Sequence, residues 1–166
     1  MKFLYFILIA CFCCANLSVK AQETKNGLTW YTDVNQVYEL STKSNKPIFA
    51  FFTGSDWCGW CHRLEAAVFD KPGFKEWANK NVILLMLDFP RNKQLPEALA
   101  KQNGELQSFF HVQGYPTIWL FTMNKDVTNN RFNITALGSL GYPDSKPGHE
   151  ETAFIANADN ILKNKK

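Results

Sequence analysis

Two cysteines stand where a strand-like segment meets a helix-like segment, and this junction constrains the fold more than any other part of the 166-residue sequence. Residues 48–52 form a continuous apolar run of strand length, which is typical of a strand buried on both faces. Over residues 58–68, apolar side chains recur every three or four positions, which predicts a helix. The loop and the helix start share the run Trp57-Cys58-Gly59-Trp60-Cys61-His62.

Other segments of the chain indicate an α/β arrangement in a single domain. Apolar and β-branched runs predict further strands over residues 82–87, 117–122 and 132–137. Capping residues and helical spacing predict helices over residues 34–44, 74–78, 96–103 and 150–162. The pattern over residues 106–112 does not decide whether that segment is helical. We expect residues 123–126 to form a turn and residues 22–27 to have no regular structure.

Three of the five cysteines lie in an N-terminal segment that has the features of a secretory signal peptide. Lys2 precedes an apolar run over residues 3–15, which is shorter than the about 20 residues that a membrane-spanning helix needs. Small side chains before the expected cleavage point place cleavage after Ala21. We therefore expect a signal peptide over residues 1–21 and one domain over residues 22–166.

Two other interpretations of the N-terminal segment stay open. The run Leu8-Ile9-Ala10-Cys11 resembles a bacterial lipobox, in which Cys11 would be lipidated and anchor the protein. The segment would also suit a buried strand or helix. Our expectation is a bacterial protein that is periplasmic or secreted, with the lipoprotein anchored through Cys11 as the alternative.

Composition excludes several classes of protein. A hydrophobic fraction of 46% with 20% charged residues excludes an intrinsically disordered chain. Eighteen basic residues against 15 acidic ones leave a formal charge of +3, too small to indicate a nucleic-acid or acidic-lipid partner. We expect no nucleic-acid binding and no membrane span.

The cysteines that remain after cleavage, Cys58 and Cys61, are predicted to be redox-active. Only a thiolate attacks a disulfide, and the positive end of a helix dipole stabilises a thiolate at the first turn, where Cys58 lies. Cys61 lies one turn further on, where it can resolve a mixed disulfide formed by Cys58. A zinc site would need four ligands, and His62, His111 and His149 are scattered along the chain. A purely structural disulfide would close only a very short loop and restrain the unfolded chain little. We expect no metal and no cofactor.

The order of strand, loop, Trp-Cys-Gly-x-Cys and helix, with a later Gly-Tyr-Pro-Thr heading a strand, resembles the thioredoxin superfamily, and particularly its exported bacterial thioredoxin-like proteins with a CGWC motif. The resemblance covers residues 30–162. It implies an α/β thioredoxin-like fold, with a central mixed sheet of four to five strands flanked by helices. It also implies that the Tyr115–Pro116 peptide bond is cis, that Pro116 faces the cysteines, and that the Tyr115 backbone pairs with an extended substrate.

Residues around the dithiol are candidates for substrate contact and for tuning its chemistry. Five are predicted to bind substrate: Trp57, Gly59, Trp60, Tyr115 and Pro116. Trp57 is also expected to pack partly on the core, whereas Trp60 lies in an exposed turn and is the better contact candidate. His62 is a candidate modulator of the pKa of Cys58, with a solvent-facing histidine as the equal alternative.

The sequence departs from the thioredoxin pattern at one point. Thioredoxins carry a buried acid, with a lysine beside it, that assists proton transfer at the second cysteine. Phe51 or Phe52 stands at the acid's position, and an apolar residue near Met86 replaces the lysine. Three candidates therefore remain for the acceptor of the Cys61 proton: water, His62 and Glu65.

These patterns predict a thiol–disulfide oxidoreductase, of reductase or isomerase type, that acts on protein disulfides in the cell envelope. Cys58 and Cys61 are its expected catalytic residues, and reduction is the expected direction. Its expected partners are protein substrates with disulfides or thiols and a redox partner protein, and it is expected to be a monomer. The alternative is a thioredoxin-like protein-binding or chaperone module with little redox turnover.

Overall fold

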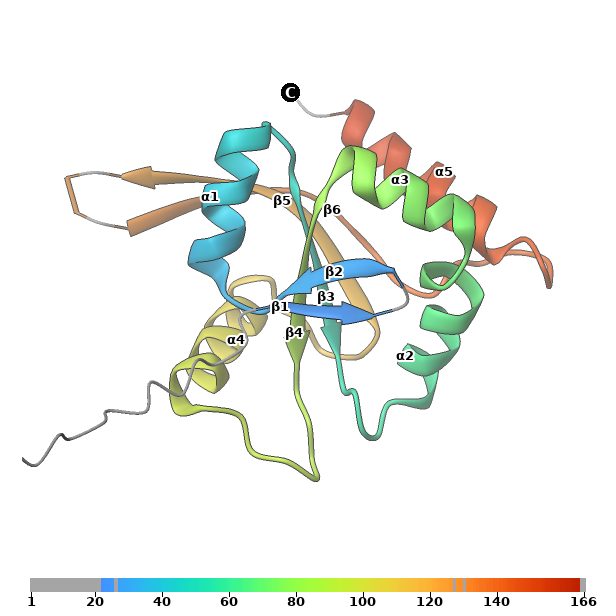
Figure 1. Cartoon of the computed structure of the whole chain (residues 1–166), viewed down its shortest axis with the longest axis horizontal. Helices are drawn as coiled ribbons and strands as arrows, with labels where there is room; N and C mark the ends of the chain where they lie inside the picture. The colour runs from blue at the N-terminus through green and yellow to red at the C-terminus, as the bar shows by residue number, and fades with distance from the viewer. Residues whose placement is uncertain (1–21, 26, 127, 130, 165–166) are drawn as a thin grey trace, which may run out of the picture.

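The computed structural model describes residues 22–25, 27–126, 128–129 and 131–164. The expected signal peptide and Cys11 lie outside these residues. A central sheet is flanked by helices on both faces (Figure 1). The strands are β1 (Gln22–Lys25), β2 (Leu28–Tyr31), β3 (Ile48–Thr53), β4 (Ile83–Asp88), β5 (Thr117–Asp126) and β6 (Arg131–Leu140). The helices are α1 (Val34–Ser44), α2 (Gly59–Leu64) with its π-helical continuation η1 (Glu65–Phe69), α3 (Pro72–Asn81), α4 (Glu97–Phe109) and α5 (Glu150–Lys163).

The sheet is mixed, as expected, but it has six strands rather than four to five, in the order β1-β2-β4-β3-β5-β6. Strand β4 pairs in parallel with β2 and β3, while β1–β2, β3–β5 and β5–β6 are antiparallel pairs. The expectation of no regular structure over residues 22–27 is wrong, because β1 forms a hairpin with β2. Gly27, with φ of +80°, supplies the left-handed backbone next to this turn.

Two apolar layers form on the two faces of β3 because successive strand side chains point to opposite faces. Phe49 and Phe51 pack with residues from α2, η1, α3 and α5, and the two cysteines belong to this layer. Ala50 and Phe52 pack on the other face with residues from α1 and α4. Figure 1 shows the same division, with α1 and α4 on one side of the sheet and α2, α3 and α5 on the other.

Most predicted helices are confirmed, with differences at their ends. Asp33 caps α1, since its carboxylate accepts from the backbone N–H groups of Asn35 and Gln36. Helix α4 runs without a break to Phe109, so it includes part of the segment that the sequence left undecided. The expected turn over residues 123–126 is wrong, because this segment continues β5 and pairs with β6. None of the helices in the described part of the chain is long and apolar enough to cross a membrane.

Candidate active site

Cys58 and Cys61 form a disulfide at the N-terminus of α2. Cys58 is the N-cap residue, and its Sγ accepts a weak hydrogen bond from the Cys61 N–H at 3.2 Å. Cys58 retains 5% of its surface, whereas Cys61 is fully buried. The helix therefore presents one sulfur at its positive end near the surface and holds the other in the core.

The loop before the disulfide is tightly folded around Gly54. The N–H groups of Trp57 and Cys58 both donate to the Gly54 carbonyl, at 3.1 and 2.8 Å. A Cβ atom at position 54 would overlap the Trp57 indole ring, so this close approach requires glycine. The loop thereby fixes Trp57 beside Cys58.

Trp57 is held by contacts on several sides and packs partly on the core, as expected. Its Nε1–H donates to the Phe89 carbonyl at 2.8 Å, and its ring meets the Tyr115 ring edge to face at 5.8 Å. The Arg91 guanidinium lies 3.7 Å from the centre of the indole ring, a cation–π contact. These contacts leave Trp57 little freedom to rearrange around a substrate.

Trp60 is 55% exposed between the two cysteines. Its ring lies 5.2 Å from that of Tyr142, and the Arg63 guanidinium lies 4.7 Å from its centre. Tyr142 was missed by the sequence analysis because it belongs to the distant loop before α5 and carries no motif. Gly59 is also exposed, and a Cβ atom there would meet nothing within 4 Å. The outer side of the dithiol turn is therefore open.

The Tyr115–Pro116 peptide bond is cis, as the resemblance implies. The Tyr115 ring stacks on Phe89 at 5.3 Å, and its hydroxyl accepts from Gln107 Nε2 at 2.7 Å. Burial raises the pKa of Tyr115, and the hydrogen bond from Gln107 opposes that rise. Through Tyr115 and Trp57, the proline loop lies next to the dithiol loop.

The His62 ring is exposed and donates from Nε2 to the Ser55 carbonyl at 2.9 Å. It thus ties the first turn of α2 to the preceding loop. His111 follows α4 and His149 precedes α5, so the three histidines come from three different elements. Among the residues that the structure describes, no three His, Cys, Asp or Glu side chains are grouped as a metal site would require.

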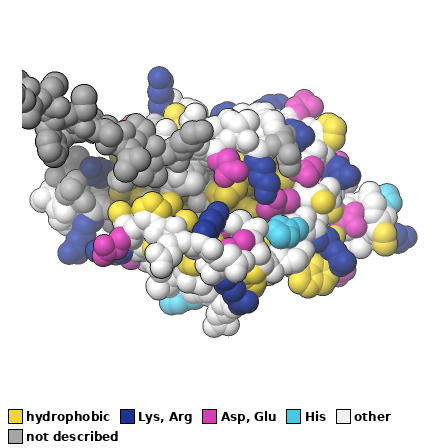
Figure 2. Space-filling view, turned by 60° about the horizontal axis from the view of Figure 1, so that its bottom comes forward, with side chains coloured by type: hydrophobic (Ala, Val, Ile, Leu, Met, Phe, Trp, Pro, Cys, Tyr) yellow, Lys and Arg dark blue, Asp and Glu magenta, His cyan; other side chains and the backbone are white. Residues whose placement is uncertain are grey.

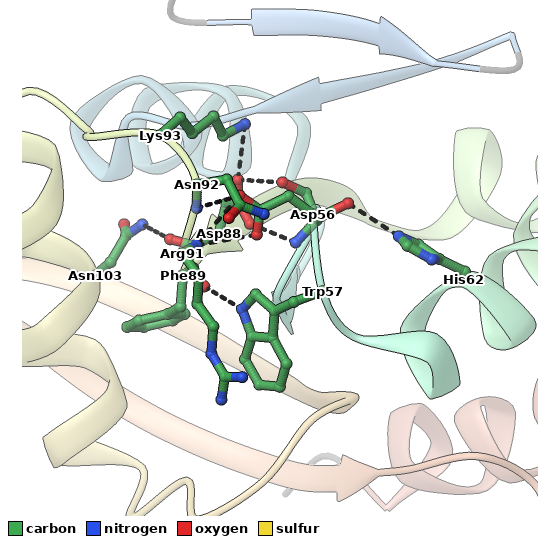
Figure 3. A network of polar contacts seen from close by, with 10 residues as sticks. Asp56, Trp57, His62, Asp88, Phe89, Arg91, Asn92, Lys93 and Asn103 are labelled. Atoms are coloured by element: carbon green, nitrogen blue, oxygen red, sulfur yellow. Dashed lines mark hydrogen bonds and ion pairs between the residues drawn. The ribbon is translucent and has the colours of Figure 1, made fainter.

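Asp88 links the dithiol loop to the segment that follows β4 (Figure 3). Its carboxylate is largely buried and accepts from the Ser55 N–H at 2.8 Å, from the Ser55 hydroxyl at 2.7 Å, and from Lys93 Nζ at 3.1 Å. Asn103 on α4 donates to the Asp88 carbonyl at 2.9 Å. This role could not be seen in the sequence, because Asp88 directly follows the predicted strand over residues 82–87 and belongs to no motif.

Asp56 makes the second connection between the same two segments (Figure 3). Its carboxylate accepts from the backbone N–H groups of Arg91 and Asn92, at 3.0 and 2.7 Å. The pKa of Asp56 is lowered, chiefly by the hydrogen bond from the Arg91 N–H, which favours the ionised form. Asp56 therefore fastens the segment after β4 to the dithiol loop.

We expect this connection to weaken in acid. A carboxyl with a lowered pKa stabilises the folded contact above its ordinary value of 3.8, and loses that contribution as the pH falls through the lowered pKa. In an NMR titration, the amide signals of Arg91 and Asn92 should shift together with a midpoint below 3.8. In Asp56→Asn, which cannot ionise, this transition should vanish. A midpoint at or above the ordinary value would contradict the assignment.

The surface near these loops carries charges of both signs. Figure 2 shows the molecule with the lower side of Figure 1 brought forward, and Lys/Arg and Asp/Glu side chains are interspersed among the residues drawn in colour. Neither sign covers a continuous area of that visible face. This mixed pattern agrees with the small net charge of the sequence.

Comparison with known proteins agrees with the geometry of the site. The family model described as thioredoxin-like matches residues 29–122, which include β3, the dithiol and the cis proline. The chain belongs to the thioredoxin-like family. The superfamily expected from the sequence is therefore confirmed, and the CGWC motif fits the Cys58–Cys61 pair.

Among curated relatives of this thioredoxin-like protein is the disulfide bond reductase DsbH of Chlamydia pneumoniae, 35% identical over 83 residues, which are 50% of each chain. The thioredoxin-related protein DsbJ of the same organism is 20% identical over 147 residues, 89% of this chain and 40% of DsbJ. The chain thus spans half or less of the length of these relatives. A solved structure of a DsbH oxidoreductase superposes with a TM-score of 0.65 at 26% identity, covering 79% of this chain and 82% of that one. A thioredoxin from Thermus thermophilus, with a TM-score of 0.56 and 14% identity, shares the fold.

Proposed function

We propose that this thioredoxin-like protein is a thiol–disulfide oxidoreductase that reduces disulfides in protein substrates. The observation that carries the proposal is the disulfide between a surface-edge Cys58 and a buried Cys61 at the start of α2. The relative named disulfide bond reductase supports the direction of electron flow. The signal-like features of residues 1–21 support action in the cell envelope.

The proposed cycle begins with both cysteines reduced. The Cys58 thiolate attacks one sulfur of a substrate disulfide, which forms a mixed disulfide and releases the other substrate sulfur as a thiolate. Cys61 then loses its proton and attacks Cys58 Sγ, and the second substrate sulfur leaves. Two electrons have passed to the substrate, and the protein is left with the Cys58–Cys61 disulfide seen in this structure. A redox partner protein would return the pair to the dithiol.

Substrate is proposed to bind over the open side of the dithiol turn. Trp60 offers an exposed aromatic surface, which suits contact with an apolar or aromatic side chain. Gly59 lets a substrate backbone approach closely, because no side chain stands there. The Tyr115 ring contacts Trp57 of the dithiol loop, and we propose that Tyr115 and the adjoining Pro116 complete the contact surface.

The decisive experiment combines insulin reduction with equilibration against glutathione. We expect the protein to accelerate insulin reduction by dithiothreitol, and its potential to lie between about −270 and −200 mV, the range of thioredoxin and glutaredoxins. A potential near about −180 or −120 mV would instead indicate an isomerase or an oxidase. Absence of insulin reduction by the full chain would favour the protein-binding alternative and contradict the proposal.

A further inference from the structure

Resolution of the mixed disulfide, a step of the proposed function on which this inference rests, requires Cys61 to lose a proton. Cys61 is fully buried, so bulk water does not reach its sulfur. The thiolate is the attacking species, and a buried thiol in apolar surroundings resists ionisation. A proton acceptor close to Cys61 would remove this obstacle.

An ion pair between Glu65 and Lys25 lies on the same side of the sheet as Cys61. Glu65 Oε2 and Lys25 Nζ are in direct contact, and the Glu65 side chain is only 12% exposed. The pair lines a narrow cavity whose other walls are mostly apolar. Those walls are Leu28, Trp30, Phe51, Phe69 and Met86, and Asp70 also lines the cavity. An ionised carboxylate in such surroundings is costly unless it is paired, and Lys25 provides the pairing charge.

Glu65 follows Cys61 by one helical turn. The Glu65 N–H donates to the Cys61 carbonyl, and side chains with this spacing lie on one face of a helix with Cβ atoms about 5–6 Å apart. Phe51 belongs to the same apolar layer as Cys61 and also lines the cavity beside Glu65, so the cavity borders the layer that holds Cys61.

The other ionisable neighbours are placed less well. His62 is bonded to the Ser55 carbonyl on the exposed side of α2. Asp70 lies at the far end of η1, more than two helical turns beyond Cys61. Lys25 bears a positive charge and is already paired with Glu65. Of the two side chains left open by the sequence, Glu65 is the one that is mostly covered and that shares a helix face with Cys61.

We propose that Glu65, held in place by Lys25, accepts the Cys61 proton when the mixed disulfide is resolved. The proton passes from Cys61 Sγ to the Glu65 carboxylate. The electron pair left on sulfur forms the bond to Cys58 Sγ, the bond between Cys58 and the substrate sulfur breaks, and the substrate sulfur leaves with that electron pair. When the disulfide is reduced again, Glu65 returns the proton to Cys61. Lys25 is the positioning residue, because its contact with Glu65 holds the carboxylate at the cavity.

The aromatic disulfide dithiobis(nitrobenzoate) separates the two steps, because each nitrothiobenzoate that it releases is coloured. Mixing with reduced protein should give a first phase that depends on probe concentration and reports Cys58. A second phase, independent of probe concentration, reports attack by Cys61. In Glu65→Gln we expect the second phase to slow at least about tenfold at neutral pH and its pH midpoint to rise, with the first phase unchanged.

Three further variants test whether Glu65 acts through its charge. Glu65→Asp keeps a carboxylate, so at low pH its second phase should be faster than that of Glu65→Gln. Lys25→Met should slow the second phase and leave the first unchanged, because the Glu65 carboxylate loses the contact that holds it at the cavity. Glu76→Gln removes an exposed glutamate from α3 and should match wild type.

The outcomes distinguish this inference from the proposed function. If wild-type protein does not release two coloured thiolates in two phases, the dithiol cycle itself fails. If it does, and Glu65→Gln keeps the wild-type second phase and pH profile, only the role of Glu65 is overturned. An equal slowing of both phases without a shift in pH profile would indicate a structural effect and would also overturn that role.

Discussion

Replacing Cys58 by serine is expected to abolish insulin-disulfide reduction, and replacing Cys61 by serine is expected to trap mixed disulfides. Cys58 is the sulfur at the surface edge of the pair, and a serine hydroxyl cannot form the mixed disulfide. Without Cys61, no internal thiolate displaces the bound substrate, so Cys61→Ser should turn over slowly and stay attached. Insulin turbidity measures the first result, and non-reducing electrophoresis with intact-mass analysis measures the second.

The double variant Cys58→Ser/Cys61→Ser is the matched control for trapping. It should form no mixed disulfide, because these are the two cysteines of the described residues. Circular dichroism of the variants against reduced wild type shows whether they are folded. Equal insulin activity in wild type and Cys58→Ser would overturn the catalytic assignment. Trapping through Cys61 in Cys58→Ser would reverse the proposed roles.

The reactive centre could be predicted from the sequence because its signals are local. An apolar strand, a tight loop and a helix with cysteines at its first turn follow one another over about twenty residues, and each has its own period or spacing. Cys58 accordingly becomes the N-cap residue of α2. The surrounding polar contacts could not be predicted in this way. Ser55 meets Asp88, and Asp56 meets Arg91, only because parallel pairing of β3 and β4 brings the ends of these strands together.

The parts of the fold that were missed are those with weak burial. Strand β1 is polar and exposed at the sheet edge, so it lacks the apolar run by which β3 and β4 are recognised. The last residues of β5, Asn124-Lys125-Asp126, are polar and resemble a turn, but they pair with β6 in a ribbon that extends beyond the core (Figure 1). Backbone hydrogen bonds to a neighbouring strand hold both segments in the sheet. The side-chain pattern of a single strand does not indicate such pairing.

The ion pair between Lys25 and Glu65 shows how a strand missed at the sequence level affects the chemistry of the site. Lys25 is the last residue of β1, the strand that the sequence analysis did not predict. Pairing of β1 with β2 brings the Lys25 ammonium to Glu65, and thereby supplies a positively charged partner at a cavity whose other walls are mostly apolar. The proposed proton acceptor thus depends on an edge strand, whereas the dithiol depends on the central one.

The apolar layer that contains the dithiol is expected to contribute strongly to the stability of the fold. Phe49→Ala is expected to lower the free energy of unfolding by about 3–5 kcal/mol, because removing a buried phenylalanine loses its transfer free energy and leaves a cavity. Phe49, the second residue of β3, is fully buried. Its ring contacts five aromatic rings, those of Trp30, Phe69, Phe74, Trp77 and Phe154. Urea or guanidinium unfolding followed by circular dichroism measures the loss.

Phe109→Ala is the matched control, since it removes the same atoms from a phenylalanine that is 51% exposed at the end of α4. Its effect should stay within about 1 kcal/mol, because little apolar surface is buried there. Both variants are compared with the disulfide closed, so that the Cys58–Cys61 bond contributes equally to every measurement. A Phe49→Ala loss as small as that of Phe109→Ala would mean that the aromatic layer beneath the dithiol is not the main support of the fold. The five rings that contact Phe49 come from β2, η1, α3 and α5, so its removal is expected to loosen the packing between β3 and four other elements of this layer at once.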